Sequence, residues 1–149
     1  MSSIPRFKII PPSTLTITVG TAIGGGDIRD LQNWNDGNVL QIQEAAGIPG
    51  YDIEMLFESV NSILEVAIFG YYVGSSTHYV NIQMYDYDAS AWLTVGTIET
   101  SLSLHCYESY LPTDSAFING SNQAKVRLYH PVSGNASHDL YIACIGLLY

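Results

Sequence analysis

Residues 51–57 read YDIEMLF, and this heptapeptide is the clearest guide to the fold class. Its apolar residues alternate with Asp52 and Glu54, which is the period of a β-strand that buries one face. The same alternation recurs from about Val39 to the C-terminus and predicts eight strands. The apolar residues that mark these eight strands are Leu40 and Ile42; Tyr51, Ile53, Met55 and Phe57; Leu64, Val66 and Ile68; Val80, Ile82 and Met84; Trp92, Leu93 and Val95; Leu102, Leu104 and Cys106; Val126 and Leu128; and Leu140, Ile142 and Cys144.

Turn residues separate these predicted strands. Pro49-Gly50 forms a turn signal, and the aspartates between Asp86 and Ala91 predict a compact hairpin connection. No stretch of ten or more residues has a helical period. Short strands with turns between them predict an all-β fold: a jelly-roll β-sandwich of about eight strands with an extended N-terminal arm. An immunoglobulin-type sandwich is the alternative.

Residues 1–37 differ in composition from the rest of the chain. They hold three of the six prolines and the run 24–26 of glycines, so we interpret 1–37 as an extended N-terminal arm and 38–149 as the sandwich domain. Residues 14–19 alternate between threonine and apolar residues, which predicts a strand at a sheet edge, either of this domain or of a neighbouring copy. The arm residues expected to contact a partner are Arg6, Phe7, Lys8, Leu15, Ile17 and Val19.

The charge of the chain restricts its partners. The formal net charge is −9 and only five residues are Lys or Arg, so the chain lacks the clustered cations of a nucleic-acid surface. Charged residues make up 13% of the chain, well below the roughly 25% of an average soluble domain, which favours self-association. No stretch resembles a secretion signal or a membrane span, so we expect a soluble protein with neither a nucleic-acid nor a membrane partner.

Catalytic motifs are not recognisable in the sequence. The four histidines stand outside any nucleophile motif. Glu54 and Glu58 alternate with core residues of one strand and are expected to be solvated rather than to face each other across a cleft. We therefore predict that the protein is not an enzyme and holds no cofactor.

Two loops carry residue types that bind metals. His130 and His138 flank a loop and would converge only if that loop doubles back. Asn35, Asp36 and Asn38 offer oxygens of the kind that bind calcium, but they supply too few ligands for a complete site. Hydrogen-bonded histidines and an ordinary turn are the favoured interpretations, so no metal site is predicted.

The two cysteines, Cys106 and Cys144, are too few for a disulfide framework. We expect both to be buried thiols that pack as small apolar groups. A disulfide between them would require their strands to be neighbours.

Aromatic residues are concentrated in one part of the chain. The sequence has eleven tyrosines, and several lie within about twenty residues of one another. Where Val80, Ile82 and Met84 point inward, some of these rings must point outward, where they suit a protein interface or a sugar-stacking platform. The predicted aromatic face consists of Tyr71, Tyr72, Tyr79, Tyr85, Tyr87 and Trp92.

Five segments of the sandwich domain carry a resemblance to a known group of proteins. They are IFGYYVG (68–74), YDYDASAW (85–92), VGTI (95–98), VRLYH (126–130) and GNASHDLYI (134–142). In these segments the region 38–149 resembles galactose-binding-domain-like jelly rolls of structural proteins of tailed bacteriophages. The arm lies outside the resemblance.

The resemblance implies a function for the protein. It implies a capsid decoration (cement) protein at the virion surface, which bridges subunits of the major capsid protein through the arm and assembles as a homotrimer. The alternative within the same group is a carbohydrate-binding or adhesion module of a phage tail or fibre.

Overall fold

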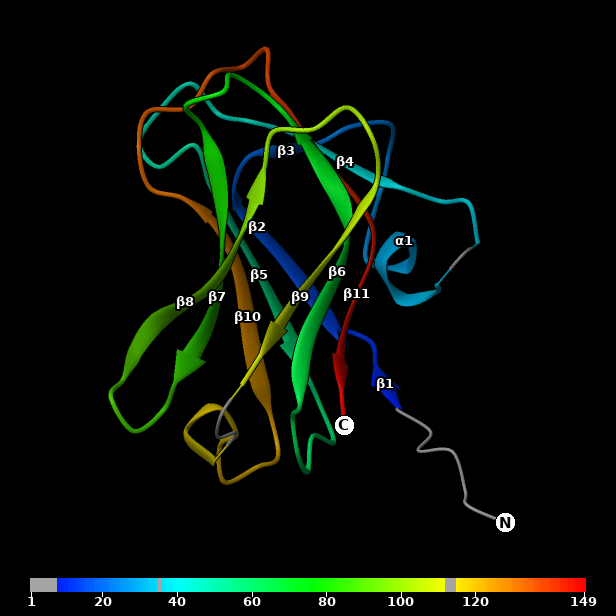
Figure 1. Cartoon of the computed structure of the whole chain (residues 1–149), viewed down its shortest axis with the longest axis vertical. Helices are drawn as coiled ribbons and strands as arrows, with labels where there is room; N and C mark the ends of the chain where they lie inside the picture. Colours follow the sequence, from blue (N-terminus) through cyan, green and yellow to red (C-terminus); the bar gives the residue numbers. More distant parts are fainter. Residues whose placement is uncertain (1–7, 35, 112–114) are drawn as a thin grey trace.

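Two antiparallel β-sheets face each other in the computed structural model, which describes residues 8–34, 36–111 and 115–149 (Figure 1). The elements are β1 (Ile9–Ile10), β2 (Thr14–Val19), β3 (Thr21–Ala22), α1 (Arg29–Gln32), β4 (Leu40–Gln43), β5 (Tyr51–Phe57), β6 (Glu65–Val73), β7 (Tyr79–Asp86), β8 (Ala91–Glu99), β9 (His105–Tyr110), the short 3-10 helix η1 (Ser115–Phe117), β10 (Ala124–His130) and β11 (Asp139–Leu148). One sheet has the order β3-β4-β11-β6-β9, and β1 also pairs with β11. The other has the order β2-β5-β10-β7-β8.

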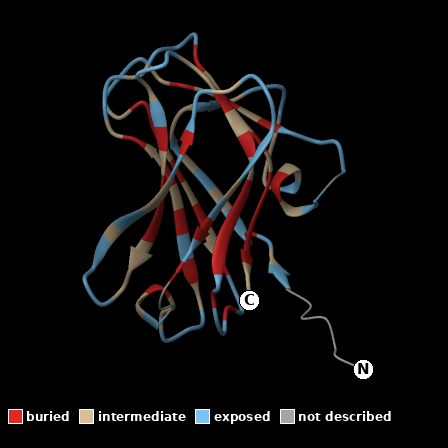
Figure 2. Cartoon of the chain, viewed as in Figure 1, coloured by how far each residue is buried: buried red, intermediate tan, exposed pale blue. Residues whose placement is uncertain are grey.

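The core fills the space between the sheets. On β5 the four residues 51, 53, 55 and 57 are buried while Asp52 and Glu54 are partly exposed, as the alternation predicts. Buried residues lie along the strands of both sheets, whereas the connecting loops are largely exposed (Figure 2). Each large apolar side chain removed from water in this way contributes about 1.5–3 kcal/mol. The fold is an all-β jelly-roll β-sandwich, which confirms the predicted fold class.

The central strand of the five-stranded sheet is β10, and its neighbours fix which of its residues face outward. Val126 and Leu128 point into the core, where Val126 is in register with Met55 of β5 and with Met84 of β7. Since side chains alternate along a strand, residues 125, 127 and 129 lie on the outer face. That outer face carries the site described below.

The described part of the N-terminal segment is bonded to both sheets. Strand β2 forms the edge of the five-stranded sheet and pairs with β5, with Leu15 opposite Met55. Strands β1 and β3 pair with β11 and β4 in the other sheet. The sequence left two placements open for residues 14–19. In the structure they form the edge of the domain's own sheet. A contact of this segment with a second protein stays a prediction.

The expected burial is wrong for Leu64, which is exposed just before β6, and for the apolar residues of 102–106. Strand β9 begins at His105, Leu102 is 86% exposed, and Leu104 and Cys106 are also exposed. On β9 it is Tyr107 that packs against the core. The apolar residues Leu104 and Cys106 instead line a pocket of about 340 Å³ on the outer side of the six-stranded sheet, together with Trp34, Val39, Phe69 and Ala143.

The two cysteines differ from each other. Cys144 is buried as predicted, but Cys106 is exposed, and both are free thiols. Both are in register with Phe69, one on each side of β6. Two strand spacings, about 10 Å, separate their backbones, which is beyond the about 7 Å that a disulfide spans.

Within the described residues, no helix has the length and apolar character needed to cross a membrane.

Candidate functional site

Aromatic and basic side chains share the outer face of the five-stranded sheet. Strand β10 contributes three of them, and the β7–β8 hairpin contributes two more from positions that are paired in register. We call this set the platform; it consists of Tyr85, Trp92, Lys125, Arg127 and Tyr129. All of its residues are partly or fully exposed, so the platform is open to solvent.

Arg127 lies at the centre of the platform. The carbon of its guanidinium group is 4.5 Å from the centre of the Trp92 ring and 4.1 Å from the centre of the Tyr129 ring. A guanidinium at such distances is held by the negative faces of both rings. Trp92 in turn meets Tyr85 edge to face at 5.3 Å, and the Lys125 ammonium lies 5.6 Å from the centre of the Tyr85 ring. The five side chains therefore form one connected surface.

Polar side chains fix Arg127 in place. Its Nε donates to Oε1 of Gln83 at 2.8 Å, and the Gln83 amide donates to the hydroxyl of Thr94 at 3.2 Å. Nη1 of Arg127 lies 4.0 Å from Oδ2 of Asp52. The other oxygen, Oδ1 of Asp52, is buried and has no hydrogen-bond partner among the described residues. The platform thus combines ring faces with donors and an acceptor at fixed positions.

The predicted aromatic face is divided among several places. Tyr85 and Trp92 belong to the platform, and Tyr87 at the tip of the hairpin meets Tyr85 edge to face at 5.0 Å. Tyr71 lies on the outside of the other sheet, stacked on Tyr141 at 4.5 Å. Tyr79 is exposed beside an open polar pocket. Tyr72 is fully buried, so its place on an exposed face is corrected.

The predicted arm residues also lie in different environments. Leu15 and Ile17 are partly buried and pack against the core, and Val19 at the end of β2 is partly exposed. Lys8 is exposed, and its ammonium lies 5.9 Å from the centre of the Tyr149 ring. Arg6 and Phe7 lie outside the described residues.

Sequence reasoning missed the three platform residues of β10. Lys125, Arg127 and Tyr129 alternate with Val126 and Leu128, which were predicted to face inward. The outward direction of the three residues was therefore available from the sequence. Their position beside Tyr85 and Trp92 was not available, because it depends on which strands pair.

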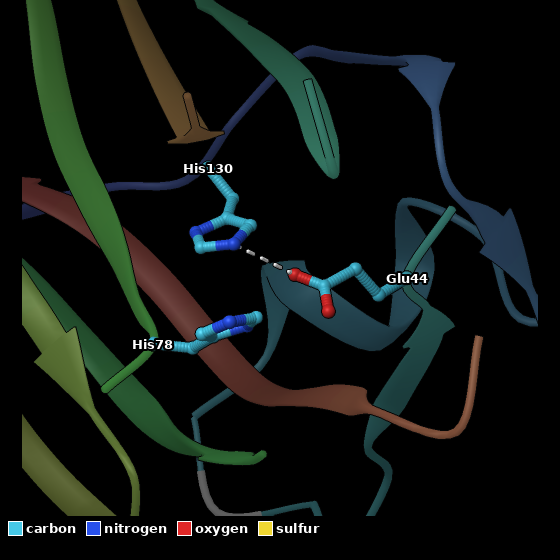
Figure 3. A group of neighbouring side chains, drawn as sticks. All are labelled: Glu44, His78 and His130. Carbon is cyan, nitrogen blue, oxygen red and sulfur yellow. Dashed lines mark ion pairs between the residues drawn. The ribbon is translucent and has the colours of Figure 1, made fainter. Parts of the chain in front are cut away.

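A second cluster of functional groups is buried at one end of the sandwich. It contains Glu44 just after β4, His78 just before β7, His130 at the end of β10 and His138 just before β11. Among the described residues, one set of three ligand-type side chains has its atoms within 4.8 Å of one another: Glu44, His78 and His130. Figure 3 shows the two imidazole rings and the carboxylate turned toward a common point.

The carboxylate of Glu44 is the centre of this buried cluster. Its side chain is fully buried, and Oε2 accepts a hydrogen bond from the backbone N–H of Asn135 at 2.9 Å. Oε2 is also 2.9 Å from Nδ1 of His138. The Tyr72 hydroxyl lies within 3.3 Å of both carboxylate oxygens, and its burial and the Glu44 charge raise the pKa of Tyr72 above its usual range.

The structure changes the two metal hypotheses. His130 and His138 do approach a common carboxylate, because the loop between them folds back over Gly50. The residue that completes a set of three ligand-type side chains with Glu44 and His130 is His78, and not His138. In the other loop, the Asp36 carboxylate accepts hydrogen bonds from the backbone and side chain of Asn38, as in an ordinary turn, and Asn35 lies outside the described residues.

Comparisons with known proteins find similarity of structure only. No family model and no curated protein matches the chain. Among solved structures, a carbohydrate-binding module of family 29 superposes with a TM-score of 0.59 and 13% identity, covering 96% of this chain and 88% of the module. A point mutant of the module CBM29-2, complexed with mannohexaose, has a TM-score of 0.55 and 14% identity over 96% and 91% of the two chains. The family 32 module of NanJ from C. perfringens, in complex with galactose, has a TM-score of 0.59 and 10% identity over 97% and 100%. At these identities the likeness establishes the shared β-sandwich fold.

Proposed function

We propose that this protein is a non-catalytic carbohydrate-binding module that holds an extended oligosaccharide on the platform. The observation that carries the proposal is the position of Arg127 between the rings of Trp92 and Tyr129 on an open sheet face. Sugar rings have apolar C–H faces and polar hydroxyl edges, so a site for them combines aromatic surfaces with a few placed donors and acceptors. The platform has both.

The polar groups around the platform suit hydroxyl recognition. Lys125 and Arg127 supply charged donors, and the partly exposed carboxylate of Asp52 supplies acceptor oxygen beside Arg127. Because the platform runs over three neighbouring strands, β10, β7 and β8, its length favours a chain of sugars over a single terminal sugar.

The fold comparisons support the same class of function. Solved structures similar to this chain include carbohydrate-binding modules, one of them in complex with mannohexaose and another in complex with galactose. Nothing in the comparisons supports the capsid decoration function that the sequence resemblance implied. The carbohydrate-binding alternative therefore replaces it as the main proposal, while the homotrimer, the major capsid protein as partner and the virion location stay predictions.

A glycan-binding measurement tests the proposal. The purified chain is screened against manno-, gluco- and galacto-oligosaccharides of increasing length, and hits are titrated by isothermal calorimetry. We expect affinity to rise with the number of sugar units until the platform is filled. Absence of binding to every glycan would contradict the proposed function. Equal affinity for galactose and for a hexasaccharide would contradict the extended mode of binding.

A further inference from the structure

We propose that Glu44, His78 and His130 bind a divalent zinc ion at the end of the sandwich. The three residues come from three chain segments that lie far apart in the sequence and meet at this end of the fold (Figure 3). The site is separate from the platform, and the inference does not depend on glycan binding.

The spacing of the ligand atoms fits a zinc ion. Oε1 of Glu44 and Nε2 of His130 are 3.5 Å apart, which is long for a charge-assisted hydrogen bond. Two ligands that each lie about 2.0–2.2 Å from a tetrahedral zinc ion are roughly 3.3–3.6 Å apart. All three ligand atoms lie within 4.8 Å of one another, so a small rotation of the His78 side chain completes the set.

Two of the imidazole nitrogens lack a hydrogen-bond partner among the described residues. Nε2 of His130 and Nδ1 of His78 are buried and make no hydrogen bond within the described residues. The His130 side chain is 1% exposed, so bulk water does not reach this nitrogen. Unpaired buried polar atoms are rare because each one costs about 1–3 kcal/mol. A cation at this point would satisfy the imidazoles and the carboxylate together.

The surrounding hydrogen bonds orient the ligands as in known metal sites. Nδ1 of His130 is 2.7 Å from the backbone carbonyl oxygen of Tyr79, to which it donates, and this leaves the lone pair on Nε2. Oε2 of Glu44 is occupied by the backbone N–H of Asn135 and by His138, so Oε1 is the oxygen that faces the imidazoles. Such outer partners fix the direction of metal ligands and tune their basicity.

Ligand type and access favour zinc. Two imidazoles and one carboxylate suit a borderline transition metal, whereas calcium and magnesium prefer oxygen ligands throughout. His78 also lines an open polar pocket together with Tyr79 and Glu99, which gives an ion a route from solvent. Three protein ligands leave the fourth tetrahedral position to a water molecule. The ion would link the ends of β4 and β10 to the segment before β7.

Metal analysis of the whole chain tests the proposal. Protein purified without an affinity tag is stripped with a chelator, dialysed against micromolar Zn²⁺ and analysed by mass spectrometry for bound metal. We expect close to one equivalent of zinc in the unsubstituted protein, a raised melting temperature, and visible absorption bands of tetrahedral type after loading with Co²⁺. Absence of stoichiometric zinc and of the cobalt bands would overturn the proposal and leave a Glu44–His130 ion pair as the function of the cluster.

Variants assign the metal to these residues. His78→Gln replaces a partly exposed side chain and should fold, and Glu44→Gln is nearly isosteric; both are expected to lose the bound zinc. His105→Gln, at an exposed histidine on β9, is the matched control and should keep it. Full zinc content in His78→Gln would overturn the assignment, as would loss of zinc in His105→Gln alone.

Discussion

The guanidinium group of Arg127 lies 4.5 Å from the ring of Trp92, although their strands, β10 and β8, are separated by β7 in the sheet. The long arginine side chain reaches over β7, where Gln83 accepts a hydrogen bond from it. Through this contact the indole of the β7–β8 hairpin is coupled to the centre of the sheet. The platform is therefore assembled before any ligand arrives, which lowers the entropic cost of binding.

Substitution of Trp92 by alanine should remove the largest ring of the platform. We expect glycan affinity to fall roughly tenfold or more, since about 1.4 kcal/mol of lost contact corresponds to a factor of ten. The melting temperature should change little, because Trp92 lies outside the core. Titration calorimetry with the best oligosaccharide measures the effect.

Tyr141→Ala is the control for this experiment. Tyr141 stacks on Tyr71 on the outside of the other sheet, so its removal takes away an aromatic surface without touching the platform. Its affinity should equal that of the unsubstituted chain. Equal losses in Trp92→Ala and Tyr141→Ala would show that the platform is not the binding surface.

Arg127→Lys should weaken binding even though the charge is kept. Lysine lacks the planar group that stacks between two rings, and it cannot reproduce the directed hydrogen bond to Gln83. We expect a several-fold loss of affinity, and a larger one for Arg127→Ala. Arg29→Lys is the control, because Arg29 forms an exposed ion pair with Asp27 away from the platform. An Arg127→Lys variant with unchanged affinity would refute the positioning role of the guanidinium.

The alternation of apolar residues along the strands also indicates which residues of the buried cluster point inward. Glu44 continues the inward period of Leu40 and Ile42, and His130 continues that of Val126 and Leu128. Both could therefore have been recognised as buried polar residues at strand ends. In the same way, the period of Val66 and Ile68 runs through Gly70 to Tyr72 and places that ring inside.

Strand pairing was not available from the sequence. The approach of Arg127 to Trp92 depends on the order β10-β7-β8, and the approach of His78 to Glu44 depends on how the loops close one end of the sandwich. Residues 102–106 were misassigned because an apolar pocket on the outer surface gives Leu104 and Cys106 the same hydrophobic character as a buried face. The period of apolar residues shows which side chains avoid water. It does not show whether they do so in the core or in an apolar pocket on the surface.

The two thiols should differ in their reaction with iodoacetamide. Burial raises the pKa of Cys144 to about 11, so at pH 8 its thiol is protonated as well as shielded. Cys106 is exposed, but partial desolvation and the nearby Glu108 also raise its pKa. We expect slow labelling of Cys106 alone in the native protein and labelling of both after unfolding in urea, as measured by peptide mass spectrometry. Equal native labelling of the two cysteines would contradict the placement of Cys144.

Glu65→Gln should stabilise the protein at neutral pH. Burial, and then the charge of Glu108, raise the pKa of Glu65, so the folded state binds its proton more tightly than the unfolded state does. Such a group destabilises the fold above its folded pKa, and the penalty disappears as the pH falls below the ordinary range of a glutamate. Urea unfolding should show a gain for Glu65→Gln at pH 7 that vanishes near pH 3. The exposed Glu58→Gln serves as control, and a gain independent of pH would contradict this explanation.

Tyr72→Phe should destabilise the fold by about 1–3 kcal/mol, because it removes a buried hydroxyl that faces both the Glu44 carboxylate and Nδ1 of His138. The phenyl ring still fills the core, so the loss reports the hydrogen bonds and not a cavity. Tyr107→Phe is the matched control, since its hydroxyl donates an exposed hydrogen bond to the Glu99 carbonyl oxygen at 3.4 Å. Chemical denaturation of both variants measures the difference. Equal losses would mean that the Tyr72 hydroxyl contributes nothing to the buried cluster, whereas a larger loss for Tyr72→Phe places this hydroxyl among the groups that hold the Glu44 carboxylate in position.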